Sequence, residues 1–156
     1  EEIKENLNEL SDAKFVHLHS HSQFSILQST ASVKDLVEAA AANNMQTVTM
    51  TDHANMMGAF HFVRAVKAYN ASLADGIEGE KKEPIKPIIG CEFQVCEDMH
   101  DRTHKDNGYQ IVILAKNKNG YHNLAKMASK AYTDGFYYMP RVDKNLVEEY
   151  KEDLIV

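Results

Sequence analysis

Short apolar segments alternate with longer amphipathic ones along this chain, and that alternation limits the folds open to it. Residues 47–53 are rich in β-branched side chains and predict a strand. The segments 33–42 and 57–71 on either side place apolar residues at helical spacing. This order of elements predicts parallel pairing and an α/β fold. By the same criteria we expect further strands at 15–19, 88–96, 109–116 and 153–156, and further helices at 121–132 and 144–150.

Individual residues refine these expectations. Ser32 and Asp143 stand where each can cap a following helix. The strand at 109–116 is almost entirely apolar at its centre, as expected for a strand buried on both faces. The polar segments 74–87 and 97–108 are expected to be surface loops.

Length and charge narrow the class of protein. With 156 residues, the chain is one domain or part of one. Hydrophobic residues make up 44% and charged residues 26%, which argues against a disordered chain. No apolar run approaches the ~20 residues that cross a bilayer, so no membrane span is predicted. Binding to a phosphate backbone usually needs a basic surface, whereas this chain has a net charge of −6. Direct binding of duplex DNA by this chain alone is therefore not expected.

The ends of the sequence and its two cysteines bear on its context. Residues 1–14 predict a lead-in helix or connector, and they contain no apolar signal peptide. The first residue is Glu, and 153–156 reads like the start of a strand, so we expect both ends to lie inside a longer protein. Cys91 and Cys96 would point to opposite faces of one strand and could not easily form a disulfide, which favours a reducing cytoplasm.

His17, His19 and His21 form the most informative pattern in the sequence. Residues two apart in an extended chain share a face, so the three imidazoles are expected to stand in a row. Imidazole is a common ligand of zinc, manganese and iron, and two imidazoles on one strand could meet one ion. A histidine-rich strand edge without a metal is the alternative, and the metal is favoured.

Three further polar residues, Asp52, His53 and Glu92, lie at or near the ends of predicted strands. Sites in α/β proteins form where strands end and loops begin, so these side chains could converge with the imidazoles. Such nitrogen and oxygen donors suit zinc or manganese better than calcium. Taken singly, Asp52 could instead be a helix or turn cap, and Glu92 a solvated carboxylate.

Other chemical signatures are absent from the sequence. It has no glycine-rich phosphate loop, no nucleophile elbow around a serine and no CxxC pair for structural zinc. His61 and His122 lie on predicted helices and are expected to pack or to face solvent. His100 and His104 are expected in a solvated loop.

Three segments together resemble the polymerase and histidinol phosphatase (PHP) domain, in the form found in bacterial replicative DNA polymerase III alpha subunits. They read FVHLHSHS at 15–22, TDHANMMG at 51–58 and KPIIGCE at 86–92. Landmarks that are similar to those of the same subunits follow up to residue 143. The resemblance covers residues 15–156, so we expect this range to be the N-terminal portion of one incomplete PHP domain.

The resemblance implies a distorted (β/α)7 barrel, truncated here at its C-terminal side, whose strand ends hold metal ions. It implies that His19, His21, His53 and Glu92 are metal ligands. Asp52 and His17 would support these ligands without touching the ion. Such sites are associated with phosphoester hydrolysis, because a bound metal lowers the pKa of water and neutralises phosphate.

Two positions depart from the family pattern. Gln28 stands where the family usually has an aspartate, and Gln110 stands where it usually has a histidine. A neutral amide is a poor ligand for a borderline cation. The sequence therefore predicts a weak or partly empty metal site without efficient hydrolysis.

Several functions follow from the resemblance. The favoured one is a structural and docking segment of the polymerase subunit, with a weakened zinc or manganese site. Its partners would be the rest of that subunit and a proofreading exonuclease subunit or domain, and DNA would be met only through the parent polymerase. The alternatives are a competent metal-dependent phosphoesterase or 3′–5′ proofreading exonuclease, or a hydrolase like histidinol phosphatase. An open barrel edge would also favour self-association.

Overall fold

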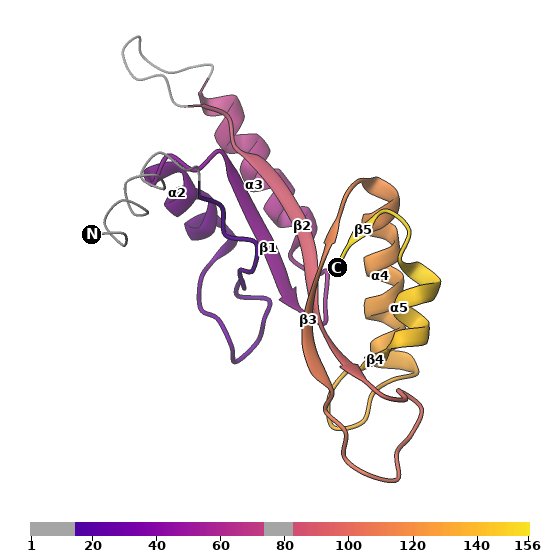
Figure 1. The fold of residues 1–156 in the computed structure, drawn as a ribbon. Coiled ribbons are helices and arrows are strands. Elements are labelled where there is room, and N and C mark those ends of the chain that lie inside the picture. Colours follow the sequence, from indigo (N-terminus) through magenta and orange to yellow (C-terminus); the bar gives the residue numbers. More distant parts are fainter. Residues whose placement is uncertain (1–14, 74–82) are drawn as a thin grey trace, which may run out of the picture.

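The computed structural model describes residues 15–73 and 83–156. Within this part, five strands form one mixed sheet in the order β1-β2-β3-β5, and β4 pairs with the far end of β2. Strands β1 and β2 run parallel, whereas β2 and β3 run antiparallel (Figure 1). The strands are β1 (Thr47–His53), β2 (Lys86–Cys96), β3 (Tyr109–Ala115), β4 (Val142–Asp143) and β5 (Leu154–Ile155).

Helices pack against this sheet in two groups. One group encloses Phe62 and Met50 in a buried cluster with β1, and the other encloses Leu124 and Phe93 in a cluster with β2 and β3. The α/β fold class is therefore confirmed. The helices in the described part are α2 (Val33–Ala42) and α3 (Ala59–Ser72) in the first group, and α4 (Lys118–Thr133) and α5 (Lys144–Tyr150) in the second.

Strand register separates two faces of the sheet. His53 of β1 pairs with Glu92 of β2, and Asp52 pairs with Cys91. Because side chains alternate along a strand, His53 and Glu92 share one face, and Asp52 and Cys91 share the other. Cys91 belongs to the buried cluster that packs against α4. His53 and Glu92 therefore lie on the face directed away from the helices.

Polar caps set where three helices begin. Ser32 and Asp35 form a capping box at the start of α2, as the Ser32 position predicted. The Asp143 side chain accepts a hydrogen bond in the first turn of α5, which confirms the predicted cap. Helix α4 begins at Lys118, earlier than predicted, because the Asn117 side chain accepts hydrogen bonds from two amides of the first turn.

No strand forms at 15–19, so that prediction is wrong. The segment meets β1 at Ser20, whose carbonyl accepts a hydrogen bond of 2.8 Å from the Thr51 amide. The Ser20 amide then donates to Thr51 Oγ1 over 2.9 Å, and the Ser22 amide donates to Asp52 Oδ1 over 2.7 Å. Side chains thus bind the backbone groups that a strand ladder would have used.

Strand β3 also differs from its prediction. The loop at 97–108 contains no helix and reverses the chain, so β3 pairs antiparallel to β2. Parallel pairing holds for β1 with β2 and for β2 with β4. Ile113 and Leu114 are buried, but Tyr109 and Gln110 are exposed. Burial on both faces is therefore limited to the second half of the strand.

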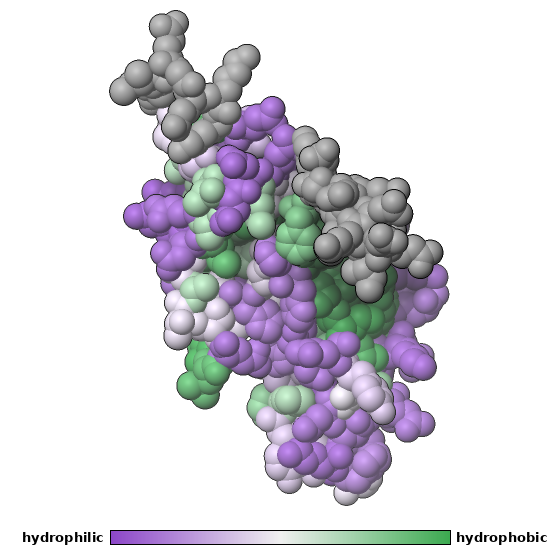
Figure 2. Space-filling model, turned by 60° about the vertical axis from the view of Figure 1, so that its left-hand side comes forward, coloured by the Kyte–Doolittle hydropathy of each residue, from purple (hydrophilic) through white to green (hydrophobic). Residues whose placement is uncertain are grey.

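The remaining expectations have mixed outcomes. The strand expected at 153–156 is present as β5, and Cys91 and Cys96 are both free and buried. The lead-in helix at 1–14 and residues 74–82 of the predicted loop lie outside the described residues. In the described part, no helix has the length and apolar character needed to cross a membrane. Hydrophilic residues predominate on the face drawn in Figure 2, and hydrophobic residues gather there in separate areas.

Candidate metal centre

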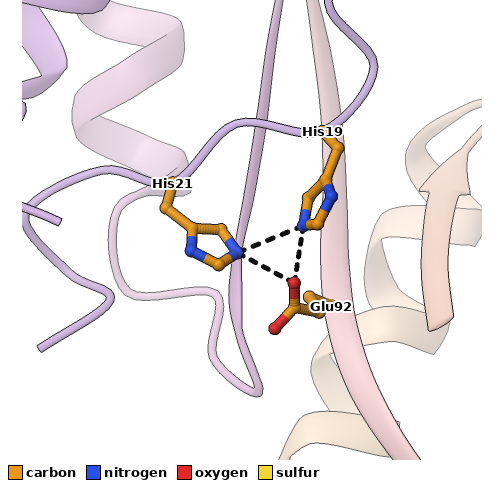
Figure 3. A group of neighbouring side chains, drawn as sticks. All are labelled: His19, His21 and Glu92. Atoms are coloured by element: carbon orange, nitrogen blue, oxygen red, sulfur yellow. Dashed lines mark hydrogen bonds and ion pairs between the residues drawn. The ribbon is translucent and has the colours of Figure 1, made fainter. Parts of the chain in front are cut away.

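His19, His21 and Glu92 bring three potential ligand atoms together (Figure 3). The Nε2 atoms of the two histidines are 3.3 Å apart, and they lie 2.5 and 3.0 Å from Glu92 Oε2. Atoms that bind one zinc ion at about 2.0–2.2 Å stand roughly 3.3–3.6 Å apart in a tetrahedron. A small outward movement of the three side chains would therefore admit an ion. Two imidazole nitrogens and one carboxylate oxygen also suit zinc or manganese chemically.

His53 joins the other side of the same carboxylate. Its Nδ1 atom lies 2.9 Å from Glu92 Oε1, so histidines contact both oxygens of Glu92. His17 lies elsewhere: it is exposed, and its ring packs edge-on against Phe15 at 4.7 Å. The expected row of three imidazoles is therefore wrong, because the segment is not a regular strand.

The side chains of the cluster differ in solvent exposure, which increases from Glu92 to His19. The Glu92 side chain is fully buried, whereas 16% of the His53 side chain, 20% of His21 and 49% of His19 are exposed. The carboxylate thus forms the floor of the cluster, and His19 forms its solvent side. A cation from solvent would approach past His19.

The contacts of Glu92 favour its ionised form. Burial acts to raise the pKa of Glu92, but hydrogen bonds from His53, Gln110 and His19 and the charge of His21 outweigh it. The resulting pKa lies below the usual value of this group. Glu92 is therefore an anion at neutral pH, as a metal ligand must be.

Asp52 is buried on the helix side of the sheet and anchors the segment that carries the imidazoles. Its Oδ1 accepts hydrogen bonds of 2.7 Å from the Ser22 amide and from Ser25 Oγ, and its Oδ2 accepts one of 2.7 Å from Ser22 Oγ. Ser25 Oγ in turn accepts a hydrogen bond of 3.0 Å from the His53 amide. These contacts fix the chain next to His21 and His53. The supporting role of Asp52 stays a prediction, and this network is its physical basis.

Sequence reasoning missed the serines and the threonine that complete this anchor. Thr51 holds Ser20, the residue between His19 and His21, through the three hydrogen bonds of its amide and hydroxyl. Ser22 and Ser25 connect the segment to Asp52. Ser20 and Ser22 alternate with histidines in the sequence, but that pattern alone does not show which strand they face.

The two glutamines for which the resemblance implies a lost ligand lie in different surroundings. Gln110 is within hydrogen-bond reach of Glu92 and helps to lower the pKa of that carboxyl. Gln28 is exposed in a turn, where its backbone N–H donates to the Ser25 carbonyl over 3.0 Å. The Gln110 side chain therefore contacts the carboxylate of the cluster, whereas Gln28 lies at the surface.

The other histidines lie outside the cluster, as expected. His100 and His104 are exposed in the 97–108 loop, and His104 Nδ1 lies 3.1 Å from Asp101 Oδ2. His61 is exposed on α3 and stacks on Phe24 at 5.8 Å, and His122 is exposed on α4.

Comparison with known proteins places the chain among relatives. Residues 17–156 match the PHP domain family. DNA polymerase III subunit alpha of Treponema pallidum is 41% identical over 145 residues, which cover 90% of this chain and 11% of that protein. The same subunit of Aquifex aeolicus is 37% identical over 150 residues, covering 90% and 12%. That of Deinococcus radiodurans is 37% identical over 153 residues, covering 91% and 10%. The chain thus spans about a tenth of the length of these relatives.

A solved structure from Bifidobacterium adolescentis, named for a metal-dependent phosphoesterase, is a more distant likeness. It shares 17% sequence identity with a TM-score of 0.49, over 76% of this chain and 33% of that one. The assignment rests instead on the sequence matches, which cover nearly all of the chain. The chain belongs to the PHP domain family, and its curated relatives are DNA polymerase III alpha subunits.

Proposed function

We propose that this chain is the PHP segment of a bacterial replicative DNA polymerase, and that its histidine–glutamate cluster binds one divalent cation weakly. The observation that carries the proposal is the convergence of His19, His21 and Glu92, whose ligand atoms lie within 4.8 Å of one another. A fully buried, ionised carboxylate with imidazoles on both oxygens is a favourable place for a cation. Zinc and manganese suit this donor set best.

The weakness of the site follows from its missing donors. Gln110 offers a neutral amide beside Glu92, and Gln28 lies at the surface. Loss of residues that only support a ligand commonly lowers metal affinity by ~10–100-fold, and loss of ligands should lower it more. A bound cation would lower the pKa of a water molecule and neutralise a phosphate. With three converging donors, the chain's own part is to hold the ion and position it, without efficient hydrolysis.

The main role of the segment is then structural. We propose that it supports the rest of the alpha subunit and offers a docking surface to a proofreading exonuclease in the cytoplasm. Exposed Ile155 and Val156, at the edge of the sheet, would also support self-association through β5. Polymerisation itself would belong to other parts of the parent enzyme.

The alternative is a competent metal-dependent phosphoesterase or 3′–5′ exonuclease. His53 favours it, because its Nδ1 lies 2.9 Å from Glu92 and could serve a second ion. A hydrolase like histidinol phosphatase is less favoured, because the relatives found over 90% of the chain are polymerase subunits.

Metal analysis separates these functions. The chain is dialysed against a buffer that holds free zinc or manganese at a low, fixed concentration, and the full-length polymerase subunit is assayed for removal of the 3′ nucleotide from DNA. We expect sub-stoichiometric metal and negligible nuclease activity, with residual binding lost in His19→Ala and kept in the control His122→Ala. Stoichiometric metal with a nuclease activity that His19→Ala abolishes would establish the alternative. Equal metal binding by both variants would refute the site itself.

A further inference from the structure

A cavity of about 670 Å³ lies between α3 and the N-terminal end of α4. Its apolar part includes Val63 of α3, Ile89 of β2 and Ala115 of β3. Ile89 and Glu92 are an odd number of residues apart on β2, so the cavity and the metal centre lie on opposite faces of the sheet. The volume is within the range of about 300–1,000 Å³ that is usual for small-molecule sites.

The charged residues that line this cavity all have the same sign. In the part of the chain that the structure describes, they are Lys67, Lys116 and Lys118, and no described carboxylate lines the cavity. The flanking helices α3 and α4 contain no Asp or Glu, although the chain has a net charge of −6. The cavity is thus a local positive site on an acidic protein and would attract an anion.

The lysines have few competing partners among the described residues. Neither Lys67 nor Lys118 forms an ion pair with a carboxylate of the described residues. Lys116 lies near Asp153, whose pKa is lowered by hydrogen bonds from Asn119 and Asn117 and then by the Lys116 charge. Among the described residues, therefore, no carboxylate competes with a ligand for the ammonium groups of Lys67 and Lys118.

Aromatic rings from both helices border the cavity. Phe60 of α3 is 70% exposed, which is high for a large apolar side chain. Tyr121 of α4 also lines the cavity, and it packs against the buried cluster around β1, which restricts its ring. An exposed ring and a partly buried ring beside an apolar floor favour a planar heterocycle, because such groups stack on aromatic side chains.

The N-terminal end of α4 adds a positive partial charge to the same side of the cavity. Its amides are already engaged: Asn117 Oδ1 accepts hydrogen bonds of 2.9 Å from the Asn119 amide and 3.1 Å from the Gly120 amide. A phosphate here would therefore be held by lysine ammonium groups, and the helix end would contribute only its dipole.

From these features we infer that the cavity binds a nucleotide, with the base against Phe60 and Tyr121 and the phosphate at Lys116 and Lys118. A free mononucleotide and the terminal nucleotide of a DNA strand share this chemistry. An acidic peptide would satisfy the lysines but would leave the aromatic border unused. The site uses none of the residues of the metal centre, so nucleotide binding in the cavity does not depend on the cation.

Nuclear magnetic resonance of the ¹⁵N-labelled chain tests this inference with deoxyadenosine monophosphate as the probe. We expect saturable shifts in amides of residues 59–63 and 118–121. The double variant Lys116→Glu/Lys118→Glu should weaken binding by at least ~10-fold through loss of charge-assisted contacts. The control Lys144→Glu reverses one charge at an exposed site on α5 and should leave binding unchanged.

A second variant guards against misfolding of the charge-reversed protein. Phe60→Ser alters an exposed residue, so the fold should persist, and the loss of stacking should weaken binding by about 10-fold. Deoxyadenosine and inorganic phosphate should each bind at least ~10-fold more weakly than the nucleotide. Tighter binding of a short single-stranded oligonucleotide would identify the strand terminus as the source, and equal or weaker binding would identify the free nucleotide.

Three results would overturn the inference. The first is a set of shifts confined to residues around His19 and Glu92. The second is an equal loss of binding in Lys144→Glu, which would show only a general charge effect. The third is tighter binding of a glutamate-rich peptide than of the nucleotide.

Discussion

Glu92 and Arg141 are both charged side chains with 0% exposure, but their partners are of opposite kinds. Glu92 is surrounded by imidazoles, one of which is half exposed. The guanidinium of Arg141 lies 5.4 Å from the centre of the Tyr137 ring. The Arg141 guanidinium donates to four backbone carbonyls, those of Met99, Asp101, Asp106 and Gly135.

The difference separates a binding site from an architectural one. Backbone carbonyls cannot turn away without a change of fold, so Arg141 ties the 97–108 loop to the chain before β4 and leaves no group for a ligand. Imidazoles can rotate toward an ion, so the surroundings of Glu92 can exchange a hydrogen bond for a metal bond. Burial of a charge therefore does not by itself identify a functional site; the mobility and chemistry of its partners do.

The largest effect is expected from substitution of Arg141, on the stability of the fold. Arg141→Met should lower the free energy of unfolding by about 3–5 kcal/mol, because it leaves buried carbonyls without donors. Urea denaturation measures the loss. Arg141→Lys should recover only part of it, since an ammonium group cannot span four acceptors as the guanidinium does. If Arg141→Met lowered the free energy of unfolding by less than about 1 kcal/mol, Arg141 would not have the architectural role that distinguishes it from Glu92.

On the binding side, Glu92→Gln should remove the anionic ligand and keep the shape of the side chain. We expect metal affinity to fall by at least ~100-fold, measured by calorimetric titration with zinc. Glu97→Gln is a matched control, because Glu97 is exposed just beyond the end of the same strand. Unchanged affinity in Glu92→Gln would show that the cluster is only a hydrogen-bond network.

Substitution of Asp52 should lower both the stability of the fold and the affinity of the cluster for metal. Asp52→Asn removes one acceptor from the network with Ser22 and Ser25, so we expect stability to fall by about 1–3 kcal/mol. Metal affinity should fall by about 10-fold, because the segment next to His21 is held less firmly. Parallel urea and calorimetric measurements test both. A loss of stability without any loss of affinity would separate the anchor from the metal centre.

Much of this arrangement could be predicted from the sequence. Local patterns identified α2 with its cap, β1, and α5 with its cap, since these depend on neighbouring residues. Ligand types and strand ends indicated that His19, His21, His53 and Glu92 would converge. The antiparallel turn into β3 and the irregular course of 15–22 could not be predicted, because they depend on contacts between distant residues such as Ser22 and Asp52.

A gain-of-function variant tests the proposed weakness of the metal site. Gln110→His places an imidazole where the amide now reaches Glu92. We expect zinc affinity to rise by about 10-fold, as a further nitrogen donor joins the cluster. Gln23→His, at an exposed position of the same loop that carries His21, adds a histidine without that geometry and should have no effect. A rise in both variants would point to binding by surface histidines.

The smallest expected effect is a pH dependence near Arg141. Hydrogen bonds from the Glu97 and Gly108 amides lower the pKa of Asp106 below its usual value of 3.8. The folded state therefore gains stability from this carboxylate above that pH, and the gain is lost as pH falls through the lower folded pKa. Thermal unfolding from about pH 6 to about pH 3 should show a smaller decline in Asp106→Asn than in the wild-type protein. Identical declines would contradict this assignment.

The most direct test of the metal centre is anomalous X-ray diffraction from crystals of the chain soaked in zinc. We expect one principal peak, bonded to Nε2 of His19, Nε2 of His21 and a carboxylate oxygen of Glu92. A principal peak at His100 and His104 instead, with the tips of His19, His21 and Glu92 spread too far apart to share an ion, would contradict the account.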